Sequence, residues 1–271
     1  MSNTCSTKSR TILWSVPRSI STAFERAIVQ LKILNEKANT ATIDIYHEPL
    51  SRSFYYSIEQ ESPRFPIVDN TLTFQQTMDQ ILNSKADYVF SKDMGYYTRG
   101  RVPKLISKDV FHTFIIRHPS KTIPSLYQAS IQTEGYVANM DFDADESGFN
   151  ELLDIFNYVK DELQQVPIII DSDDLLTNPY DYMKEYCRLT KLPWDENMLT
   201  WESGITPEGW EDWNGWHDSA INSTGLIKKK LNTNESHKNK YEKELNLPIV
   251  KDAIEKNLKA YEELLKHKLI I

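Results

Sequence analysis

Short apolar runs and longer amphipathic stretches alternate along this chain of 271 residues. The short runs are rich in β-branched and aromatic residues and end in proline or polar residues, a pattern typical of buried strands. They predict strands at Thr11–Val16, Ala41–His47, Asp87–Met94, Phe111–Arg117 and Pro167–Asp171. The amphipathic stretches carry apolar residues three and four positions apart, which is helical spacing. They predict helices from Thr22 to Leu34 and at Thr73–Asn83, Ser120–Gln132, Phe149–Gln165 and Pro248–Lys268.

Strands and helices in this alternating order predict an α/β fold of three layers, P-loop-like, in which helices flank a mainly parallel central sheet. Leu50–Asn70 shows no clear period and is expected to be irregular. No low-complexity linker and no internal repeat divides the chain. We therefore predict a disordered N-terminus at residues 1–10 and a single domain at residues 11–271, in which residues 194–240 form a loop region over the substrate or cofactor.

Composition and charge narrow the classes of function. No apolar run is long enough to span a membrane, and the first ten residues are too polar for a signal peptide. Cys5 and Cys187 have neither disulfide-framework nor metal-ligand spacing, which favours a reducing, cytoplasmic location and suggests no metal. The net charge of -8 argues against a nucleic-acid partner and favours a cationic small molecule. The sequence leaves the oligomeric state open.

The segment VPRSISTAF, Val16–Phe24, joins the first predicted strand to the first predicted helix. Its backbone N–H groups and the positive end of the helix dipole point at one place, and the hydroxyls of Ser19, Ser21 and Thr22 suit a helix N-cap. Together with Arg18 they predict a phosphate-binding turn. The GxxxxGK[ST] pattern of a Walker A loop is absent. The alternative is an ordinary strand-to-helix turn with a surface arginine.

Further polar residues fall where predicted strands end. The set comprises Arg18, His47, Glu48, Lys92, Asp93, Arg117 and His118. The carboxyl ends of parallel strands meet at one edge of a sheet, and ligands of such folds bind there. We therefore expect these residues to contribute to one site.

The segment FIIRHPSKTIPSLY carries an arginine at a strand end and a serine eight positions later on the following helix. Arg117 and Ser125 at this spacing resemble the 3′-phosphate motif of sulfotransferases that use 3′-phosphoadenosine 5′-phosphosulfate (PAPS), and Val16–Phe24 takes the place of their 5′-phosphosulfate loop. Over residues 11–225 the chain thus resembles the PAPS-dependent sulfotransferase family. The segments VFSKDM and DSDDLLTNP and the turn at residues 223–225 are similar to its bacterial and plant branch.

The resemblance implies a donor and a set of roles. PAPS would be the sulfuryl donor and adenosine 3′,5′-bisphosphate (PAP) the product, with no metal required. The 5′-phosphosulfate would be held by Arg18 and the N–H groups of Ser19, Ile20, Ser21 and Thr22, and the 3′-phosphate by Arg117, Ser125, Ser223, Thr224 and Gly225. Lys92 would neutralise the leaving oxygen.

The loop departs from the family pattern at three positions. Arg18 stands in place of the usual lysine, Ile20 in place of a glycine, and Ala23 in place of the aromatic residue that often stacks on adenine. Arginine can clamp an anion with two hydrogen bonds but is a poor proton donor, so its role would be electrostatic. Phe24 or a tryptophan from later in the chain is the candidate for stacking.

Three residues are candidates for the base that takes the acceptor proton. Asp93 ranks first because it follows Lys92 at a strand end, as in the family pattern. His47 ranks second because histidine suits this task near neutral pH, and Glu48 ranks third. The structural alternatives are an ion pair between Lys92 and Asp93 and a histidine that only caps its strand.

The stretch Trp201–Asp218 mixes four tryptophans with five acidic residues. It is either a flap over the core or a lid whose indoles and carboxylates suit a cationic acceptor. In this respect the chain is similar to sulfotransferases of cyanobacterial toxin clusters, which modify guanidinium alkaloids such as saxitoxin. We expect transfer to the hydroxyl or amine of a small polar, cationic molecule. The alternatives are a P-loop nucleotide kinase or NTPase, which the missing GK[ST] disfavours, and a non-catalytic nucleotide-binding module.

Overall fold

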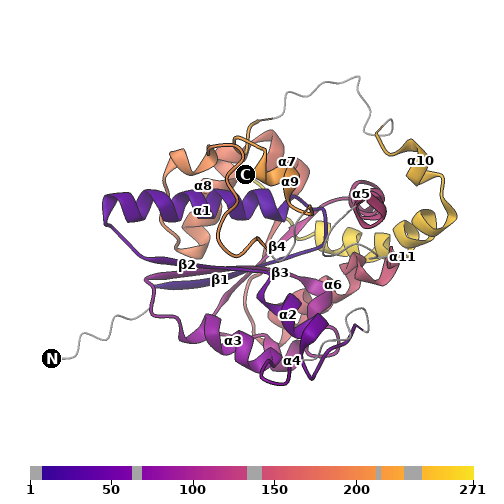
Figure 1. The fold of residues 1–271 in the computed structure, drawn as a ribbon, viewed down its shortest axis with the longest axis horizontal. Helices are drawn as coiled ribbons and strands as arrows, with labels where there is room; N and C mark the ends of the chain where they lie inside the picture. The colour runs from indigo at the N-terminus through magenta and orange to yellow at the C-terminus, as the bar shows by residue number, and fades with distance from the viewer. Residues whose placement is uncertain (1–7, 63–68, 133–141, 212–214, 229–239) are drawn as a thin grey trace.

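The computed structural model describes residues 8–62, 69–132, 142–211, 215–228 and 240–271. Five strands form one sheet: β1 (Ser9–Ser15), β2 (Ile43–His47), β3 (Tyr88–Met94), β4 (Phe111–Ile116) and β5 (Ile168–Asp171). Their order is β2-β3-β1-β4-β5, and every neighbouring pair is parallel. The predicted α/β fold with a mainly parallel sheet is confirmed (Figure 1).

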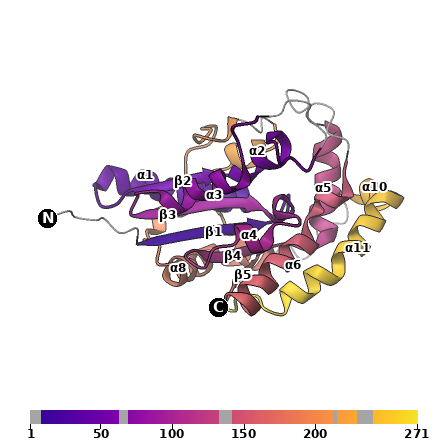
Figure 2. The same cartoon turned by 90° about the horizontal axis from the view of Figure 1, so that it is seen from below.

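Helices pack on both faces of this sheet. They are α1 (Ser21–Ala38), α2 (Pro49–Tyr56), α3 (Phe74–Asn83), α4 (Val102–Leu105), α5 (Pro119–Gln132), α6 (Phe149–Asn157), α7 (Ser172–Thr177), α8 (Pro179–Thr190), α9 (Asp218–Ile221), α10 (Glu242–Leu245) and α11 (Pro248–Leu265). Short 3₁₀ turns lie at η1 (Gly95–Thr98), η2 (Ala144–Ser147) and η4 (Glu196–Leu199), and a π-helical turn at η3 (Tyr158–Glu162). Helices α1, α7 and α8 cover one face and α2, α3, α4 and α6 the other (Figure 1), while α11 packs along α5 and α6 (Figure 2).

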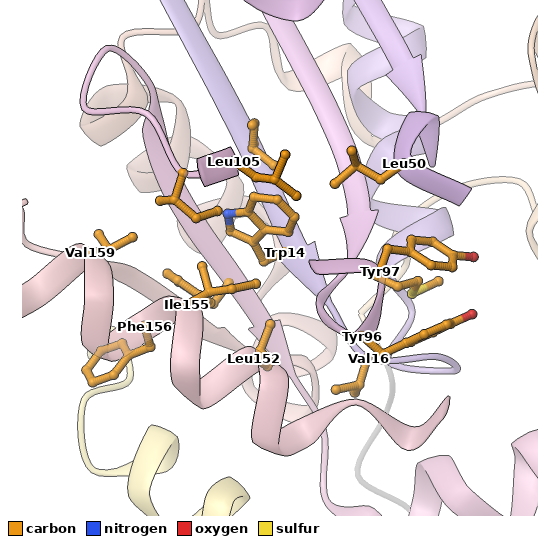
Figure 3. Packing of buried hydrophobic residues seen from close by; sticks show 14 of the residues in the cluster. Trp14, Val16, Leu50, Tyr96, Tyr97, Leu105, Leu152, Ile155, Phe156 and Val159 are labelled. Atoms are coloured by element: carbon orange, nitrogen blue, oxygen red, sulfur yellow. The ribbon is translucent and has the colours of Figure 1, made fainter. Parts of the chain in front are cut away.

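Successive side chains of β1 enter two different cores, as expected for a strand buried on both faces. Leu13 packs in the cluster that includes Phe24 of α1. Trp14 packs in the cluster on the opposite face with Leu105 and Ile155 (Figure 3). β1 is therefore buried on both sides at the centre of the sheet, and its carboxyl end opens directly into the loop before α1.

Of the helices that the sequence pattern does not predict, α2 and α8 are the longest. α2 begins directly after Glu48, so the expectation of an irregular segment from Leu50 is wrong for its first turns. Pro49 occupies the first helical position, where its missing N–H removes no hydrogen bond, and Leu50 and Phe54 are buried in the core. The second helix, α8, buries Met183 among its core residues. Both helices are short and depend on tertiary packing rather than on a long apolar period.

Strand β1 and helix α6 differ from their predicted boundaries. β1 begins at Ser9, inside the segment 1–10 that was expected to be disordered. α6 ends at Asn157 and passes into the π-helical turn η3, so the helix predicted at 149–165 is interrupted. Parts of two predicted segments lie outside the described residues: residues 1–7 of the N-terminal segment, and residues 212–214 and 229–239 of the covering region.

Among the helices that are described, none combines the length and apolar character needed to cross a bilayer.

The packing on α6 yields a stability prediction. Ile155 is fully buried, so Ile155→Ala should lower the free energy of unfolding by about 2–5 kcal/mol in urea titrations, because it leaves a cavity against the sheet. Ile131→Ala, on α5, is the matched control: that side chain is 58% exposed, and the expected change is within about 0.5 kcal/mol. Equal losses for the two variants would contradict the assigned core.

Candidate functional site

A cavity of about 590 Å³ opens at the carboxyl ends of the strands, a size usual for small-molecule sites. Its walls come from the β1–α1 loop, α2 and the residue before it, the end of β3 with η1, the end of β4 with α5, and residues 216–228. Single residues of η2 and α7 and the two residues before α10 complete the lining. Of the predicted site residues, those that line it are Arg18, Ile20, Ser21, Thr22, Glu48, Arg117, Ser125, Ser223 and Gly225. Those that do not line it are Ser19, His47, Lys92, Asp93, His118 and Thr224.

The backbone of the β1–α1 loop forms a concave surface of N–H groups. Arg18 and Ile20 have φ values of 65° and 66° on either side of Ser19, and such alternation turns successive N–H groups to one side. The first hydrogen bond of α1 is accepted by the Ile20 carbonyl, so the N–H groups of Ser21–Ala23 have no acceptor within the helix. Ile20 is the N-cap, in place of the predicted hydroxyl residues, and the Ser19 hydroxyl donates instead to the Val16 carbonyl at 2.7 Å.

Two arginines meet at this loop. Arg18 Nε donates to Ser125 Oγ at 3.1 Å, and Arg18 Nη1 donates to the Trp216 carbonyl at 3.0 Å. Arg117 Nη1 donates to the Arg18 carbonyl at 3.4 Å, and its Nε lies 4.0 Å from Asp173 Oδ1. The structure therefore brings the residues of the two predicted anion-binding motifs into one cavity.

Several donors around these arginines lack acceptors. Arg117 Nε and Trp216 Nε1 are buried without a hydrogen-bond partner among the described residues. Burial lowers the pKa of Arg18; Tyr241 acts in the opposite direction, and Arg117 lowers the pKa further. A bound anion would satisfy the donors and stabilise the guanidinium charge.

The turn formed by Ser223, Thr224 and Gly225 is held by close backbone packing. A Cβ atom on Gly225 would lie 2.4 Å from the Leu199 carbonyl oxygen, so the turn requires glycine. The Ser223 hydroxyl donates to the Ala220 carbonyl at 2.6 Å and is already engaged. The turn thus shapes the cavity wall through Ser223 and Gly225.

A buried ion pair lies where β2 and β3 end. Lys92 Nζ donates to Glu48 Oε1 and lies 3.9 Å from Glu25 Oε2. The Tyr97 hydroxyl donates to Glu48 Oε2 at 3.2 Å. Burial raises the pKa of Glu48, but Lys92 and the neighbouring histidines outweigh burial and lower this pKa to about 2. Lys92 is 0% exposed, so it neutralises Glu48 from behind the cavity wall.

Asp93 is bound by the backbone. The N–H groups of Leu50 and Met94 donate to its carboxyl oxygens at 3.1 and 3.2 Å. Burial raises the pKa of Asp93 well above its ordinary range, and Glu48 acts in the same direction. Asp93 therefore ties the start of α2 to the end of β3, and its position behind the cavity wall does not favour it as the acceptor base.

A series of buried hydrogen bonds joins α1, β2 and the covering segment, which we define as residues 201–211 and 215–228. Glu25 Oε2 lies 2.8 Å from His47 Nδ1, and His47 Nε2 lies 2.8 Å from His217 Nε2. Trp210 Nε1 donates to Glu25 Oε1 at 3.0 Å, and its ring packs against both imidazoles. Burial lowers the pKa of His217 well below its usual value, and His47 adds to this shift. His217 lines the cavity, with His47 behind it.

The ligand atoms of His47, Glu48 and His217 lie within 4.8 Å of one another, a spacing that also suits a metal ion. In this structure, however, the two imidazoles bond to each other and Glu48 bonds to Lys92. The buried ammonium group of Lys92 would repel a cation here. We therefore interpret the cluster as a hydrogen-bonded network.

Aromatic and acidic side chains line another part of the cavity. The hydroxyls of Tyr55 and Tyr96 lie 3.1 Å apart, and Tyr55 donates to Glu146 Oε1 at 3.2 Å. Tyr97 and Glu48 line the cavity as well. Ring faces next to carboxyl groups suit a polar or cationic organic molecule.

Sequence reasoning did not assign several residues of this site. They are Tyr55, Tyr96, Tyr97, Glu146, His217, Lys228, Lys240 and Tyr241 around the cavity, and Glu25 and Trp210 behind it. The sequence pattern could have indicated His217, because this residue belongs to the tryptophan-rich stretch expected to form a lid. It could not have indicated Glu25, since an acidic residue on an amphipathic helix is expected to face solvent.

The family model of the sulfotransferase domain matches residues 9–240 of this chain. The chain belongs to the sulfotransferase domain family. This membership confirms the resemblance carried by the Val16–Phe24 and Arg117–Ser125 segments. The narrower similarity to toxin-cluster enzymes stays a prediction.

Two curated relatives come from Arabidopsis thaliana. Branched-chain-amino-acid aminotransferase-like protein 2 is 25% identical over 219 residues, which cover 79% of this chain and 35% of that protein. Branched-chain-amino-acid aminotransferase-like protein 1 is 25% identical over 226 residues, covering 80% and 36%. This sulfotransferase-family chain therefore spans about a third of the length of these relatives. A solved sulfotransferase domain from the curacin biosynthetic pathway is 14% identical to this chain, with a TM-score of 0.45. The match covers 98% of this chain and 100% of that chain.

The Glu48–Lys92 pair predicts a pH-dependent contribution to stability. The folded-state pKa of about 2 lies below the ordinary 4.5, so the Glu48 carboxylate stabilises the fold above pH 4.5, and this contribution is lost as the pH falls towards about 2. Glu48→Gln should lower the free energy of unfolding at pH 7 by about 3–5 kcal/mol, because it leaves Lys92 without its partner. The gap between wild type and variant should narrow below about pH 4.5 in urea titrations.

The control for this measurement is Glu185→Gln, which removes an exposed ion pair with Arg188. It should change the free energy of unfolding by less than about 1 kcal/mol at pH 7. A gap for Glu48→Gln that stays constant from pH 7 to acid would show that Glu48 is not the stabilising carboxylate.

Proposed function

We propose that this chain transfers a sulfuryl group from PAPS to a small polar acceptor and releases PAP. The observation that carries the proposal is the meeting of Arg18 and Arg117 at an N–H-rich loop, in one cavity with buried donors that have no acceptor among the described residues. A nucleotide with anionic groups at both its 3′ and 5′ positions matches this set of donors. Membership of the sulfotransferase domain family supports the sulfuryl chemistry.

On this proposal the 5′-phosphosulfate lies against the N–H groups of Ser21–Ala23, with Arg18 beside it. A helix N-terminus and a concave row of N–H groups both favour such a negative group. The 3′-phosphate lies on Arg117 and Ser125. The Arg18 side chain donates to Ser125, and its backbone carbonyl accepts from Arg117, so the residues proposed to bind the two ends of the nucleotide are in direct contact.

Sulfuryl transfer, like phosphoryl transfer, depends on positioning and on neutralising the negative charge that develops on the leaving oxygen. Arg18 supplies a permanent charge on the cavity wall and is the residue we assign to this task. Lys92 lies behind the wall, so we assign it an indirect role, in which it holds Glu48 ionised and in place.

We also propose that the acceptor is cationic. Glu48 and Glu146 place carboxyl groups on the cavity wall, together with the rings of Tyr55, Tyr96 and Trp216. Rings and carboxylates bind ammonium and guanidinium groups through cation–π and charge-assisted contacts. The net charge of -8 would favour the approach of such a molecule.

The two alternative classes have less support. A P-loop kinase or NTPase uses a Walker lysine, and this loop carries Arg18 without the GK[ST] pattern. A nucleotide-binding module without catalysis would not need acid–base groups beside its anion loop. Here the imidazole of His217 lines the same cavity as that loop.

Isothermal calorimetry with PAP and 5′-AMP tests the donor site. PAP should bind at least about tenfold more tightly than 5′-AMP, because the 3′-phosphate gains charge-assisted hydrogen bonds. Arg117→Ala should weaken PAP binding about 10–100-fold and leave 5′-AMP binding almost unchanged. Arg188→Ala, at a side chain 68% exposed on α8, is the matched control and should alter neither. Equal affinity of the wild type for both nucleotides would reject the 3′-phosphate site.

A matched pair of acceptors tests the proposed charge. With PAPS as donor, 4-hydroxybutylguanidine should be sulfated with a kcat/KM at least about tenfold higher than that of 4-hydroxybutylurea, which has the same shape but no charge. PAP release followed by mass spectrometry of the product measures both rates. Equal rates, or a preference for the urea, would exclude a cationic acceptor and leave PAPS-dependent transfer in place.

A further inference from the structure

We infer that His217 is the catalytic base of the proposed sulfuryl transfer, and that His47 and Glu25 position it and take up its charge. This inference rests on the proposed function. It concerns the buried chain Glu25–His47–His217, which joins α1 to the covering segment and reaches the cavity through His217 alone of the three.

The geometry gives each nitrogen of the chain a partner except one. His47 Nδ1 bonds to Glu25 Oε2, and His47 Nε2 bonds to His217 Nε2, both at 2.8 Å. Trp210 holds the other oxygen of Glu25 at 3.0 Å, so this carboxyl group is fixed at both ends. No described residue bonds to His217 Nδ1, and His217 lines the cavity. His217 Nδ1 is therefore the atom available to an acceptor.

The positions of the protons follow from these bonds. His47 donates from Nδ1 to the Glu25 carboxylate, so its Nε2 can accept the Nε2–H of His217, which leaves a lone pair on His217 Nδ1. Burial lowers the pKa of His217, which keeps this imidazole neutral and able to accept a proton.

The transfer step then balances. The bond from sulfur to the 5′-phosphate oxygen breaks, PAP leaves with its electron pair, and a bond forms between sulfur and the acceptor oxygen or nitrogen. The acceptor proton moves to His217 Nδ1, and the Nε2 proton of His217 passes to His47 Nε2. The positive charge ends on His47, 2.8 Å from the Glu25 carboxylate.

The surrounding charges favour this end state. The charged groups that face the histidine pair are Glu25 from α1, Glu48 at the start of α2, Lys92 from β3 and Arg18 from the β1–α1 loop. The two carboxylates and the ammonium group leave one negative charge in the buried cluster, and one proton on the pair neutralises it. Arg18 disfavours a charge on His217 itself, so the proton is better placed on His47.

Glu48 is a weaker candidate for the same role. Lys92 and Tyr97 occupy its two carboxyl oxygens, and its pKa of about 2 makes it a poor proton acceptor. His217 also has a direct connection to the donor loop, because Arg18 donates to the carbonyl of the preceding residue, Trp216. The base and the proposed phosphosulfate site are thus fixed to each other.

The experiment compares His217→Gln with His267→Gln, a control at a side chain that is 38% exposed and does not line the cavity. PAP release from PAPS is measured with 4-hydroxybutylguanidine as acceptor, and PAP affinity by calorimetry. We expect kcat of His217→Gln to fall about 100–10,000-fold with PAP affinity within about threefold of wild type, because glutamine can keep the bond to His47 but cannot act as a base. His267→Gln should keep the wild-type rate.

The pH profile separates positioning from a merely structural role. In the wild type, kcat should fall on the acid side as His217 takes a proton, at a pH below the 6.5 usual for histidine because burial lowers the pKa of His217. Glu25→Gln removes the anion that favours the protonated pair, so the acid limb should move to lower pH while kcat falls about tenfold. A change in kcat without movement of the limb would overturn the role of Glu25.

The remaining outcomes are decisive as well. A His217→Gln rate within about threefold of wild type would overturn the inference while PAPS-dependent transfer stands. Loss of wild-type activity in EDTA and its return with a divalent metal would show that His47, Glu48 and His217 bind a metal, and would also overturn it. A wild type that binds PAP no better than 5′-AMP and releases none from PAPS would reject the proposed function, and the inference with it.

Discussion

Three charged side chains are buried together where β2 and β3 end: Glu25, Glu48 and Lys92. The rest of the structure has to keep these three side chains in contact. Any one of these charges left alone in the interior would destabilise the fold by several kcal/mol, so the three side chains have to remain together. Each comes from a different element, and their contact fixes α1, the start of α2 and β3 relative to one another. The histidines complete the cluster, and His217 extends it to the cavity.

The anion loop depends on a second constraint, which is backbone strain. Arg18 and Ile20 hold positive φ angles without being glycine, a conformation that persists only where the surroundings enforce it. The Ser172 hydroxyl contacts the carbonyls of Ser19 and Ile116 at 2.6 and 2.8 Å and so fixes the loop to the ends of β4 and β5. The N–H groups at the start of α1 are therefore preorganised. The loop would need to change its conformation little to bind an anion.

The covering segment connects these two constraints. Its Trp216 carbonyl accepts from Arg18 of the anion loop, and its Trp210 indole donates to Glu25 of the buried cluster. Gly225 permits the tight approach to Leu199 that returns the chain along the cavity wall. The proposed donor site and the proposed acid–base groups are therefore parts of one network, in which the indoles of Trp201 and Trp210 both pack and donate hydrogen bonds.

The sequence by itself determined the α/β fold, the sites at which the strands end, and the family, because these depend on local periodicity and on two short motifs. It also identified Arg18, Arg117 and Ser125, which the structure brings into one cavity. The tertiary structure alone decided which polar residues face that cavity: Asp93 is held by backbone N–H groups, whereas His217 and Glu25 come together across 192 positions of sequence. Such contacts arise from the packing of distant elements around buried charge, and no local pattern in the chain encodes them.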